Sequence, residues 1–183
     1  MKTIKIIFFV TVTIIVIFFV FLKYLGFFTK PTVTERMEGG LLVAGINFTG
    51  DYSKTYRPMV DVDNKLRAIG VECSRGFGIY YDDPKTTPQE QCRSFVGNVI
   101  ETIDTVRLQQ IKNTGLTVDS IPLRTSMIAE FKIKSKLSYM IGPMIIYPAI
   151  AKYMHGKQYK ILLSAEIYDI PKKRILYIMQ FSK

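Results

Sequence analysis

The run of residues 6–22, IIFFVTVTIIVIFFVFL, constrains the chain most, because it holds no charged side chain. Its only polar groups are Thr11 and Thr13, whose hydroxyls can bond back to a helix backbone. At about 1.5 Å per residue, a helix of this run and the apolar residues after it crosses a hydrocarbon core of roughly 30 Å. A buried core helix would rarely be β-branched and aromatic on every side. The run therefore predicts one transmembrane helix, and we assign residues 1–28 to a membrane anchor.

A secretory signal peptide is the main alternative, because Lys2 and Lys5 form a short basic region before the apolar run. The run is longer than the usual apolar region of about 7 to 15 residues, and residues 23–28 (KYLGFF) offer no small-x-small cleavage site. We therefore expect the helix to stay in the mature protein. Lys23, Lys30 and Arg36 follow the helix, three basic residues against two before it, which favours a cytoplasmic domain.

The rest of the chain divides into a linker and one domain. Residues 29–40 combine Pro31, polar side chains and the pair Gly39-Gly40, which is typical of a linker. Residues 41–183 suffice for one domain with its own core and are too few for two comfortable ones.

Charge and composition exclude several classes of function. The net charge of +10 comes from dispersed cations, of which only residues 172–174 form a cluster, so we expect no nucleic-acid partner. Cys73 and Cys92 are too few for a disulfide scaffold and lack the spacing of a metal knuckle. His155 is the single histidine, which argues against zinc sites, histidine-based triads and a haem ligand. We expect no cofactor.

Hydrophobic periodicity predicts two similar series of elements. In the first we expect a strand from residue 41, a loosely helical stretch at 53–66, strands at 67–73, 77–81 and 93–99, and a helix at 106–113. In the second we expect a strand at 127–133, a helix from 137, and strands at 161–170 and 175–181. Pro143 and Pro148 should break or bend that helix, with a short second helix at 148–155.

A short string supports the similarity of the two series. Residues 81–84 (YDDP) match residues 168–171 (YDIP) at an offset of 87, which is 168 minus 81. Each string closes a strand that follows a strand and a helix in the predicted order. An internal duplication is the simplest explanation.

Glu166 lies in the middle of a predicted strand. Alternation places Ser164, Glu166 and Tyr168 on one face of that strand. A carboxylate buried against a sheet is unfavourable unless another group pairs with it or it takes part in binding or catalysis. A solvent-facing glutamate on a half-exposed strand remains the simpler alternative.

Several of these segments resemble a known family. Gly50-x-Tyr52, residues 79–84 (IYYDDP) and residues 165–168 (AEIY) resemble the gyrase-inhibitor-like family, with its multidrug-regulator effector domains and SOUL haem-binding proteins. Further segments are similar to the branch of testis-expressed endoplasmic-reticulum-phagy receptors, which also have one N-terminal membrane helix. These segments are Pro88 and residues 92–93, 96–97, 147–150 and 152–153. With the anchor, the resemblance covers nearly the whole chain.

The resemblance implies an α+β fold of duplicated strand-helix-strand-strand units, with a groove between them. Carried over by motif, Glu166 takes the acidic position of that groove, and Tyr168, Tyr81 and Tyr52 are candidate wall residues. Such a site suits an apolar cation through charge and cation–π attraction. Aromatic packing remains the alternative explanation for each tyrosine.

Three functions follow. The first is a membrane-anchored binding module that recruits a small ligand or a protein at the endoplasmic reticulum membrane, with its domain in the cytoplasm. The second is a receptor for autophagy of that organelle. The resembled receptors use an acidic tail with an aromatic-x-x-aliphatic motif. The sequence stops at Lys183 without one, which counts against this function unless a partner or a missing tail supplies the motif. The third is a small hydrolase with Glu166 as its base, although no Trp exists to build an aromatic clamp.

Overall fold

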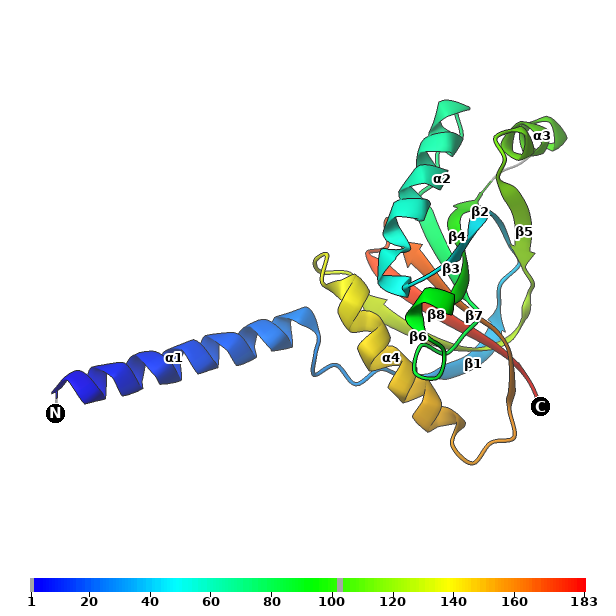
Figure 1. Cartoon of the computed structure of the whole chain (residues 1–183). Coiled ribbons are helices and arrows are strands. Elements are labelled where there is room, and N and C mark those ends of the chain that lie inside the picture. The colour runs from blue at the N-terminus through cyan, green and yellow to red at the C-terminus, as the bar shows by residue number, and fades with distance from the viewer. Residues whose placement is uncertain (1, 102–103) are drawn as a thin grey trace.

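The computed structural model describes residues 2–101 and 104–183 (Figure 1). Its helices are α1 (Lys2–Leu25), α2 (Tyr56–Ala68), α3 (Thr105–Asn113) and α4 (Ser138–Met154), with short 3-10 turns at Tyr52–Lys54 and Gln89–Gln91. Its strands are β1 (Thr34–Glu38), β2 (Leu41–Thr49), β3 (Arg75–Tyr80), β4 (Arg93–Ile100), β5 (Thr117–Ile121), β6 (Arg124–Lys132), β7 (Lys160–Asp169) and β8 (Arg174–Ser182).

Helix α1 projects away from the domain (Figure 1). Within the described residues it is the one helix that is long and apolar enough to cross a membrane, a test that a signal sequence also passes. The Thr11 and Thr13 hydroxyls donate to the carbonyls of Ile7 and Phe9 at 2.9 Å, so the two polar groups are satisfied inside the helix.

The strands form one antiparallel sheet in the order β1-β6-β8-β7-β3-β4-β2-β5. Two strand-helix-strand-strand units are present, β2-α2-β3-β4 and β6-α4-β7-β8, and they meet where β3 pairs with β7. The two Tyr-Asp-x-Pro strings lie at the ends of β3 and β7. The predicted duplicated α+β fold is confirmed.

The helices α2 and α4 cover one face of the sheet (Figure 1). Helix α2 packs on β2 and β4, whereas α4 packs on β6 and β8. The central strands β3 and β7 therefore lie under the space between the two helices, which is where the resemblance implies a groove.

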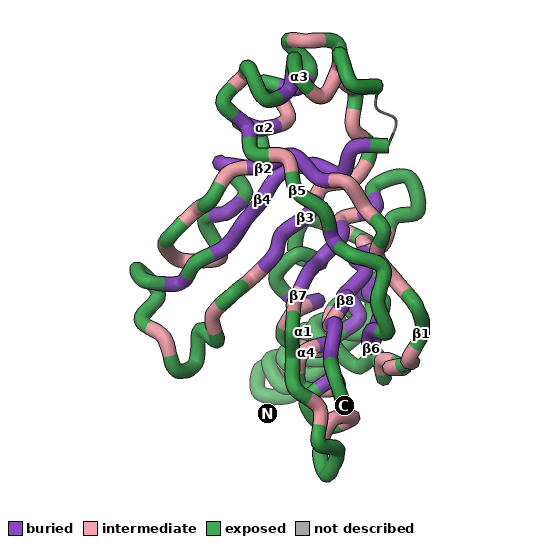
Figure 2. Tube along the Cα trace, turned by 90° about the vertical axis from the view of Figure 1, so that its right-hand side faces the viewer, coloured by how far each residue is buried: buried purple, intermediate pink, exposed green. Residues whose placement is uncertain are grey.

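A hydrophobic core also lies on the opposite face, because the sheet curls on itself. Its members come from alternate positions of the central strands and include Phe77, Ile79, Phe95, Ala165, Ile167 and Ile178. Figure 2 shows the buried residues concentrated along β3, β4, β7 and β8. Where β3 pairs with β7, side chains on both faces of the sheet are consequently shielded from water.

The strand predicted at 67–73 is wrong. Residues 56–68 form α2, whose buried residues Pro58, Val62 and Leu66 recur every four positions and face the sheet. Pro58 lies in the first turn, where its missing N–H does no harm. Gly70, with φ of +71°, ends the helical stretch, so only β3 follows as a strand.

The separate helix predicted at 148–155 is also wrong. Helix α4 runs without interruption from Ser138 to Met154 and contains Pro143 and Pro148. Its buried residues, among them Ile146 and Ile150, pack against β6 and β8. This packing outweighs the local preference of proline to end a helix.

Two strands were not anticipated. Strand β1 lies inside the range predicted as a linker, and it pairs with β6 through Glu35 and Met127 among others. Strand β5 follows α3 and pairs with the edge of β2. The sheet therefore begins before Leu41.

Candidate functional site

Glu166 lies at the centre of the sheet, between Gly78 on β3 and Tyr177 on β8. Its side chain points to the face that α2 and α4 cover, because Ala165 and Ile167 belong to the core on the other face. The residue is 3% exposed. The alternative of a solvent-facing glutamate is therefore wrong.

Tyrosine hydroxyls are the hydrogen-bond partners of this carboxylate. Tyr147 of α4 donates to Oε1 of Glu166 at 2.8 Å, and Tyr168 of β7 donates to Oε2 at 3.0 Å. The hydroxyls of Tyr168 and Tyr80 lie 2.8 Å apart. Within the described residues Glu166 makes no salt bridge. We call Tyr80, Tyr147, Glu166, Tyr168 and Tyr177 the Glu166 cluster.

Two glycines make room for these rings. Gly78 pairs with Glu166, and a Cβ at Gly78 would lie 2.8 Å from Cζ of Tyr80. The Tyr80 ring thus folds back over its own strand towards Glu166. A Cβ at Gly142 of α4 would collide with the Tyr177 hydroxyl, so α4 approaches β8 closely only because this position lacks a side chain.

Burial governs the electrostatics of the cluster. It raises the pKa of Glu166 to about 7, although the hydrogen bonds from Tyr147 and Tyr168 act to lower that pKa. Burial and the neighbouring carboxylate raise the pKa values of Tyr80, Tyr147, Tyr168 and Tyr177. The phenols therefore remain donors at neutral pH, and Glu166 is the member that changes charge there.

The Tyr177 hydroxyl is a buried donor without a partner among the described residues. Tyr177 is 1% exposed, and its ring meets that of Tyr147 edge-on at 5.6 Å. A buried hydroxyl left unbonded is unfavourable, and such a group invites an explanation. A ligand with an acceptor atom would provide one.

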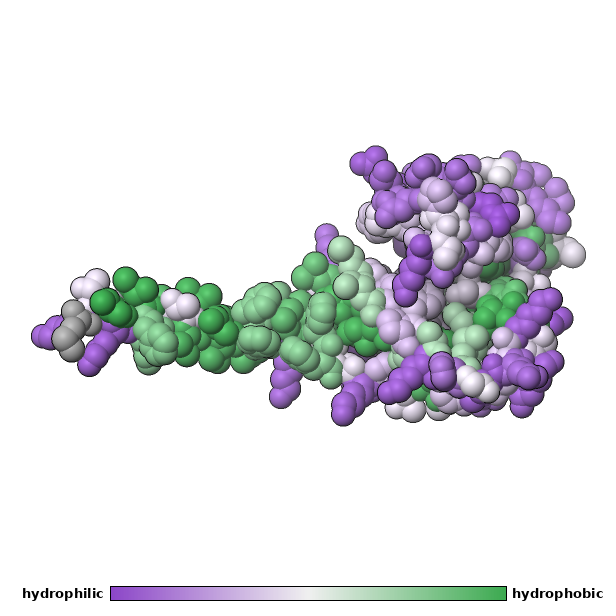
Figure 3. All heavy atoms as spheres, turned by 60° about the horizontal axis from the view of Figure 1, so that its bottom comes forward, coloured by the Kyte–Doolittle hydropathy of each residue, from purple (hydrophilic) through white to green (hydrophobic). Residues whose placement is uncertain are grey.

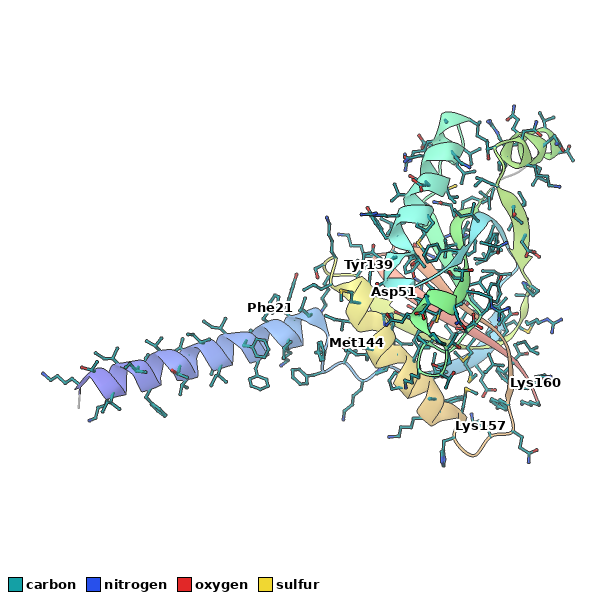
Figure 4. The ribbon with its side chains drawn as sticks, in the orientation of Figure 1. Phe21, Asp51, Tyr139, Met144, Lys157 and Lys160 are labelled. Atoms are coloured by element: carbon teal, nitrogen blue, oxygen red, sulfur yellow. The ribbon has the colours of Figure 1, made fainter. Side chains whose placement is uncertain are left out.

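Tyr139 closes the cluster on the solvent side. It lies on the first turn of α4 (Figure 4), and its ring packs on Tyr168 at 5.7 Å between centroids. Tyr139 is 38% exposed, whereas Glu166 beneath is enclosed. Burial and nearby Tyr56 of α2 raise the pKa of Tyr139.

The structure brings together only part of the predicted site. Tyr168 contacts Glu166 directly. Tyr52 is one layer further out: its ring meets Tyr80 at 4.8 Å, and its hydroxyl donates to the Arg93 carbonyl at 2.9 Å. Tyr81 follows the last residue of β3 and is 54% exposed, so its neighbour Tyr80 occupies the place expected for it.

Sequence reasoning missed Tyr80, Tyr147 and Tyr177. Tyr80 had a usable signal, because it alternates with Gly76 and Gly78, the partners of Tyr168 and Glu166. Tyr147 and Tyr177 reach the carboxylate through the packing of α4 on β8, which no local pattern indicates. As for metals, no three His, Cys, Asp or Glu side chains gather as ligands in the part of the chain that the structure describes.

Comparison with curated proteins finds one similar sequence, and no family model matches the chain. Testis-expressed protein 264 homolog of Mus musculus is 26% identical over 162 residues, which cover 83% of this chain and 50% of that protein. The chain thus spans about half the length of the curated relative it matches.

Comparison with solved structures supports the fold. The crystal structure of the EcmrR C-terminal domain has a TM-score of 0.53 and 12% identity, covering 84% of this chain and 98% of that one. EcmrR in a complex with DNA, solved by cryo-EM, also gives a TM-score of 0.53 at 12% identity, covering 84% of this chain and 57% of EcmrR. At this identity the likeness shows a shared fold, which is consistent with the resemblance to the gyrase-inhibitor-like family.

Proposed function

We propose that this chain is a membrane-anchored binding module whose Glu166 cluster binds an apolar cation. The observation that carries the proposal is a buried carboxylate with tyrosine hydroxyls as its partners and no salt bridge within the described residues. A buried carboxylate without a positive partner is unfavourable in its ionised form. A bound cation would supply the missing charge.

The tyrosines suit such a ligand. Aromatic ring faces attract cations, more strongly when the pair is shielded from water, and they also provide apolar contact area. The phenol groups stay uncharged at neutral pH. The Tyr177 hydroxyl, which has no partner in the part of the chain that the structure describes, could donate to a ligand acceptor. The charge of the carboxylate and the tyrosine rings together favour a cation with an apolar body.

Access requires two rings to move. Glu166 is enclosed, and Tyr168, with Tyr139 packed on it, lies between the carboxylate and solvent. A ligand would displace the Tyr168 hydroxyl from Oε2 of Glu166 and replace that hydrogen bond with its own charge. Binding then couples to a change in the rotamers of Tyr139 and Tyr168.

Calorimetric titration of the full chain in detergent micelles tests this function. The ligands are lipophilic ammonium ions of graded size, each beside a neutral analogue of the same shape. Glu166→Gln keeps the shape of the side chain and removes its charge, so it should weaken cation binding by about 1–3 kcal/mol. Glu90→Gln, at an exposed position, is the matched control. Equal binding by wild type and Glu166→Gln, or binding of neutral analogues alone, would reject the proposal.

The anchor and its orientation belong to the same proposal. We propose that α1 stays in the endoplasmic reticulum membrane and that the domain faces the cytoplasm, supported by the apolar helix, the basic residues after it and the family resemblance. The protein should resist alkaline carbonate washing and retain Lys2 to Leu25 by intact mass. Proteases added to sealed microsomes should digest the domain, and the sequon at Asn47 should carry no glycan. A glycosidase-sensitive band would place the domain in the lumen.

A hydrolase is the second candidate, favoured by the raised pKa of Glu166. A carboxylate with a pKa of about 7 is well matched to general-base catalysis at neutral pH. The test is turnover of small strained-ring substrates by the full chain. Activity that Glu166→Gln abolishes would favour the enzyme, whereas binding without turnover supports the module.

A role in autophagy of the endoplasmic reticulum extends the module to a protein partner. It is supported by the resemblance to the phagy receptors and needs the docking motif that those receptors carry. Cross-linking of the full chain in cells under starvation, followed by identification of its neighbours, tests this role. If no autophagosomal protein is found among those neighbours, the role in autophagy is rejected, whereas the proposed binding module is unaffected.

A further inference from the structure

The end of α1 is packed against the domain. Leu25 is 4% exposed and shares a hydrophobic cluster with Phe131 of β6. The backbone of Gly26, with φ of +90°, lies beside the Phe131 ring, where an added Cβ would be 3.1 Å from Cζ. Lys134 donates to the Tyr24 carbonyl at 2.6 Å, and its Nζ lies 5.4 Å from the centroid of the Tyr24 ring. These contacts hold α1 beside the β6–α4 connection.

An exposed apolar surface begins at the same place. Leu137, Met140 and Met144 are 44%, 66% and 62% exposed, and their spacing puts them on one side of α4. Figure 4 shows Met144 on the side of α4 that faces the end of α1. Figure 3 shows apolar residues continuing from α1 onto the adjoining part of the domain.

Positive charge lies beside this surface, where α4 begins. Lys132, Lys134 and Lys136 are exposed and directly precede α4. The β7–β8 turn, with Lys172 and Lys173, adjoins them, because the Ile133 N–H donates to the Lys173 carbonyl at 2.8 Å.

We infer that this surface, made by Leu137, Met140, Met144 and the lysines at 132, 134 and 136, lies on the anionic headgroup layer of the membrane that α1 crosses. The inference rests on the proposed function to the extent that α1 must be inserted. Apolar side chains at an interface gain burial among acyl chains, and each nearby lysine is attracted to anionic lipid. The α4 surface can reach the headgroups because the contacts at Leu25 and Lys134 leave it beside the end of the spanning helix.

This arrangement gives the proposed ligand a route. Tyr139 lies between Leu137 and Met140 on the first turn of α4, and it packs on Tyr168 above Glu166. Apolar cations concentrate at anionic membranes for the same reasons that the α4 surface would bind there. The cation would then reach the cluster from the lipid interface.

Single tryptophans test the contact, because the chain contains no Trp. Three variants of the full chain are placed in nanodiscs whose lipids carry brominated acyl chains, with phosphatidylserine present or absent. Met144→Trp reports on the α4 surface, Val106→Trp on exposed α3 far from α1 is the control (Figure 1), and Phe9→Trp reports on α1. With phosphatidylserine, emission from Met144→Trp should be blue-shifted and quenched at least two-fold, whereas Val106→Trp should be unaffected.

The outcomes separate the two claims. If Phe9→Trp is quenched while Met144→Trp emits like Val106→Trp, the anchor stands and the α4 contact is rejected. If Phe9→Trp is not quenched, α1 is not inserted and the proposed anchor fails first. Replacing Lys132 and Lys136 by Gln should reduce the quenching of Met144→Trp. The same two replacements in the Phe9→Trp variant should leave its quenching unchanged. If the quenching of Met144→Trp changes neither with the two lysine substitutions nor with phosphatidylserine, the role of anionic headgroups in the contact is rejected.

Discussion

The Tyr147 hydroxyl on α4 donates a hydrogen bond of 2.8 Å to Oε1 of Glu166 on β7. This bond favours the ionised carboxylate and so acts against the effect of burial on its pKa. Tyr147→Phe should therefore raise the pKa of Glu166 above its value of about 7. NMR titration of the carboxyl carbon measures the change, with Tyr81→Phe at an exposed position as the control. A pKa that falls in Tyr147→Phe would show that the bond does not stabilise the carboxylate.

Titration of Glu166 should make the free energy of unfolding depend on pH. Its folded pKa of about 7 is higher than the ordinary value of 4.5, so the folded state binds the proton more tightly than the unfolded state. The resulting stabilisation is complete below about pH 4.5 and is lost as the pH rises through 7, by up to about 3 kcal/mol. Glu166→Gln should flatten this part of the curve in denaturant titrations at pH 5 and 8. An unchanged slope, equal to that of Glu90→Gln, would contradict the raised pKa.

Because Gly142 lies close to Tyr177, we expect Tyr177→Phe to restore the stability that Gly142→Ala loses. Gly142→Ala should lower the free energy of unfolding by about 1–3 kcal/mol, because its methyl group meets the Tyr177 hydroxyl. Tyr177→Phe removes a buried hydroxyl without a partner among the described residues, so alone it should be neutral or stabilising. The double variant should regain most of the stability lost in Gly142→Ala. A double variant as unstable as Gly142→Ala would mean that the clash lies elsewhere.

One carboxylate links strand β1 to the end of α4. Oε1 of Glu35 accepts hydrogen bonds from Tyr153 at 3.0 Å, Lys157 at 3.1 Å and Tyr159 at 2.9 Å, and these partners lie at the end of α4 and after it. Lys157 is at that end of the domain in Figure 4. Glu35→Ala should speed hydrogen exchange of the β1 amides while the β3 amides remain protected. Uniform acceleration in both strands would indicate global destabilisation in place of local opening.

The duplicated fold was predictable, because each half repeats strong local periodicities and ends its third element with Tyr-Asp-x-Pro. The errors arose where tertiary contacts outweigh local preference. Packing on β6 and β8 keeps α4 continuous through Pro143 and Pro148. Edge strand β1 has no apolar alternation of its own and is recognised only by its pairing with β6.

The candidate site was predictable only in its central residues. Alternation placed Glu166 and Tyr168 on one face, and the structure joins them. The family resemblance implied Tyr81 as a wall residue, yet a shift of one residue moves a side chain to the other face of a strand, and Tyr80 joins the cluster. Tyr147 reaches Glu166 from a helix 19 residues earlier in sequence, a contact that only the assembled fold creates.

Proton release on binding tests most directly the claim that Glu166 is the counter-charge of a bound cation. At pH 6, below its pKa of about 7, most Glu166 side chains hold a proton that a cation must displace. Calorimetric titration of the full chain with a lipophilic ammonium ion, in two buffers of different ionisation enthalpy, counts the protons released. We predict close to one proton per bound cation for the wild type and none for Glu166→Gln. Cation binding without proton release at pH 6, or the same release from Glu166→Gln, would contradict the assignment of Glu166 as the counter-charge.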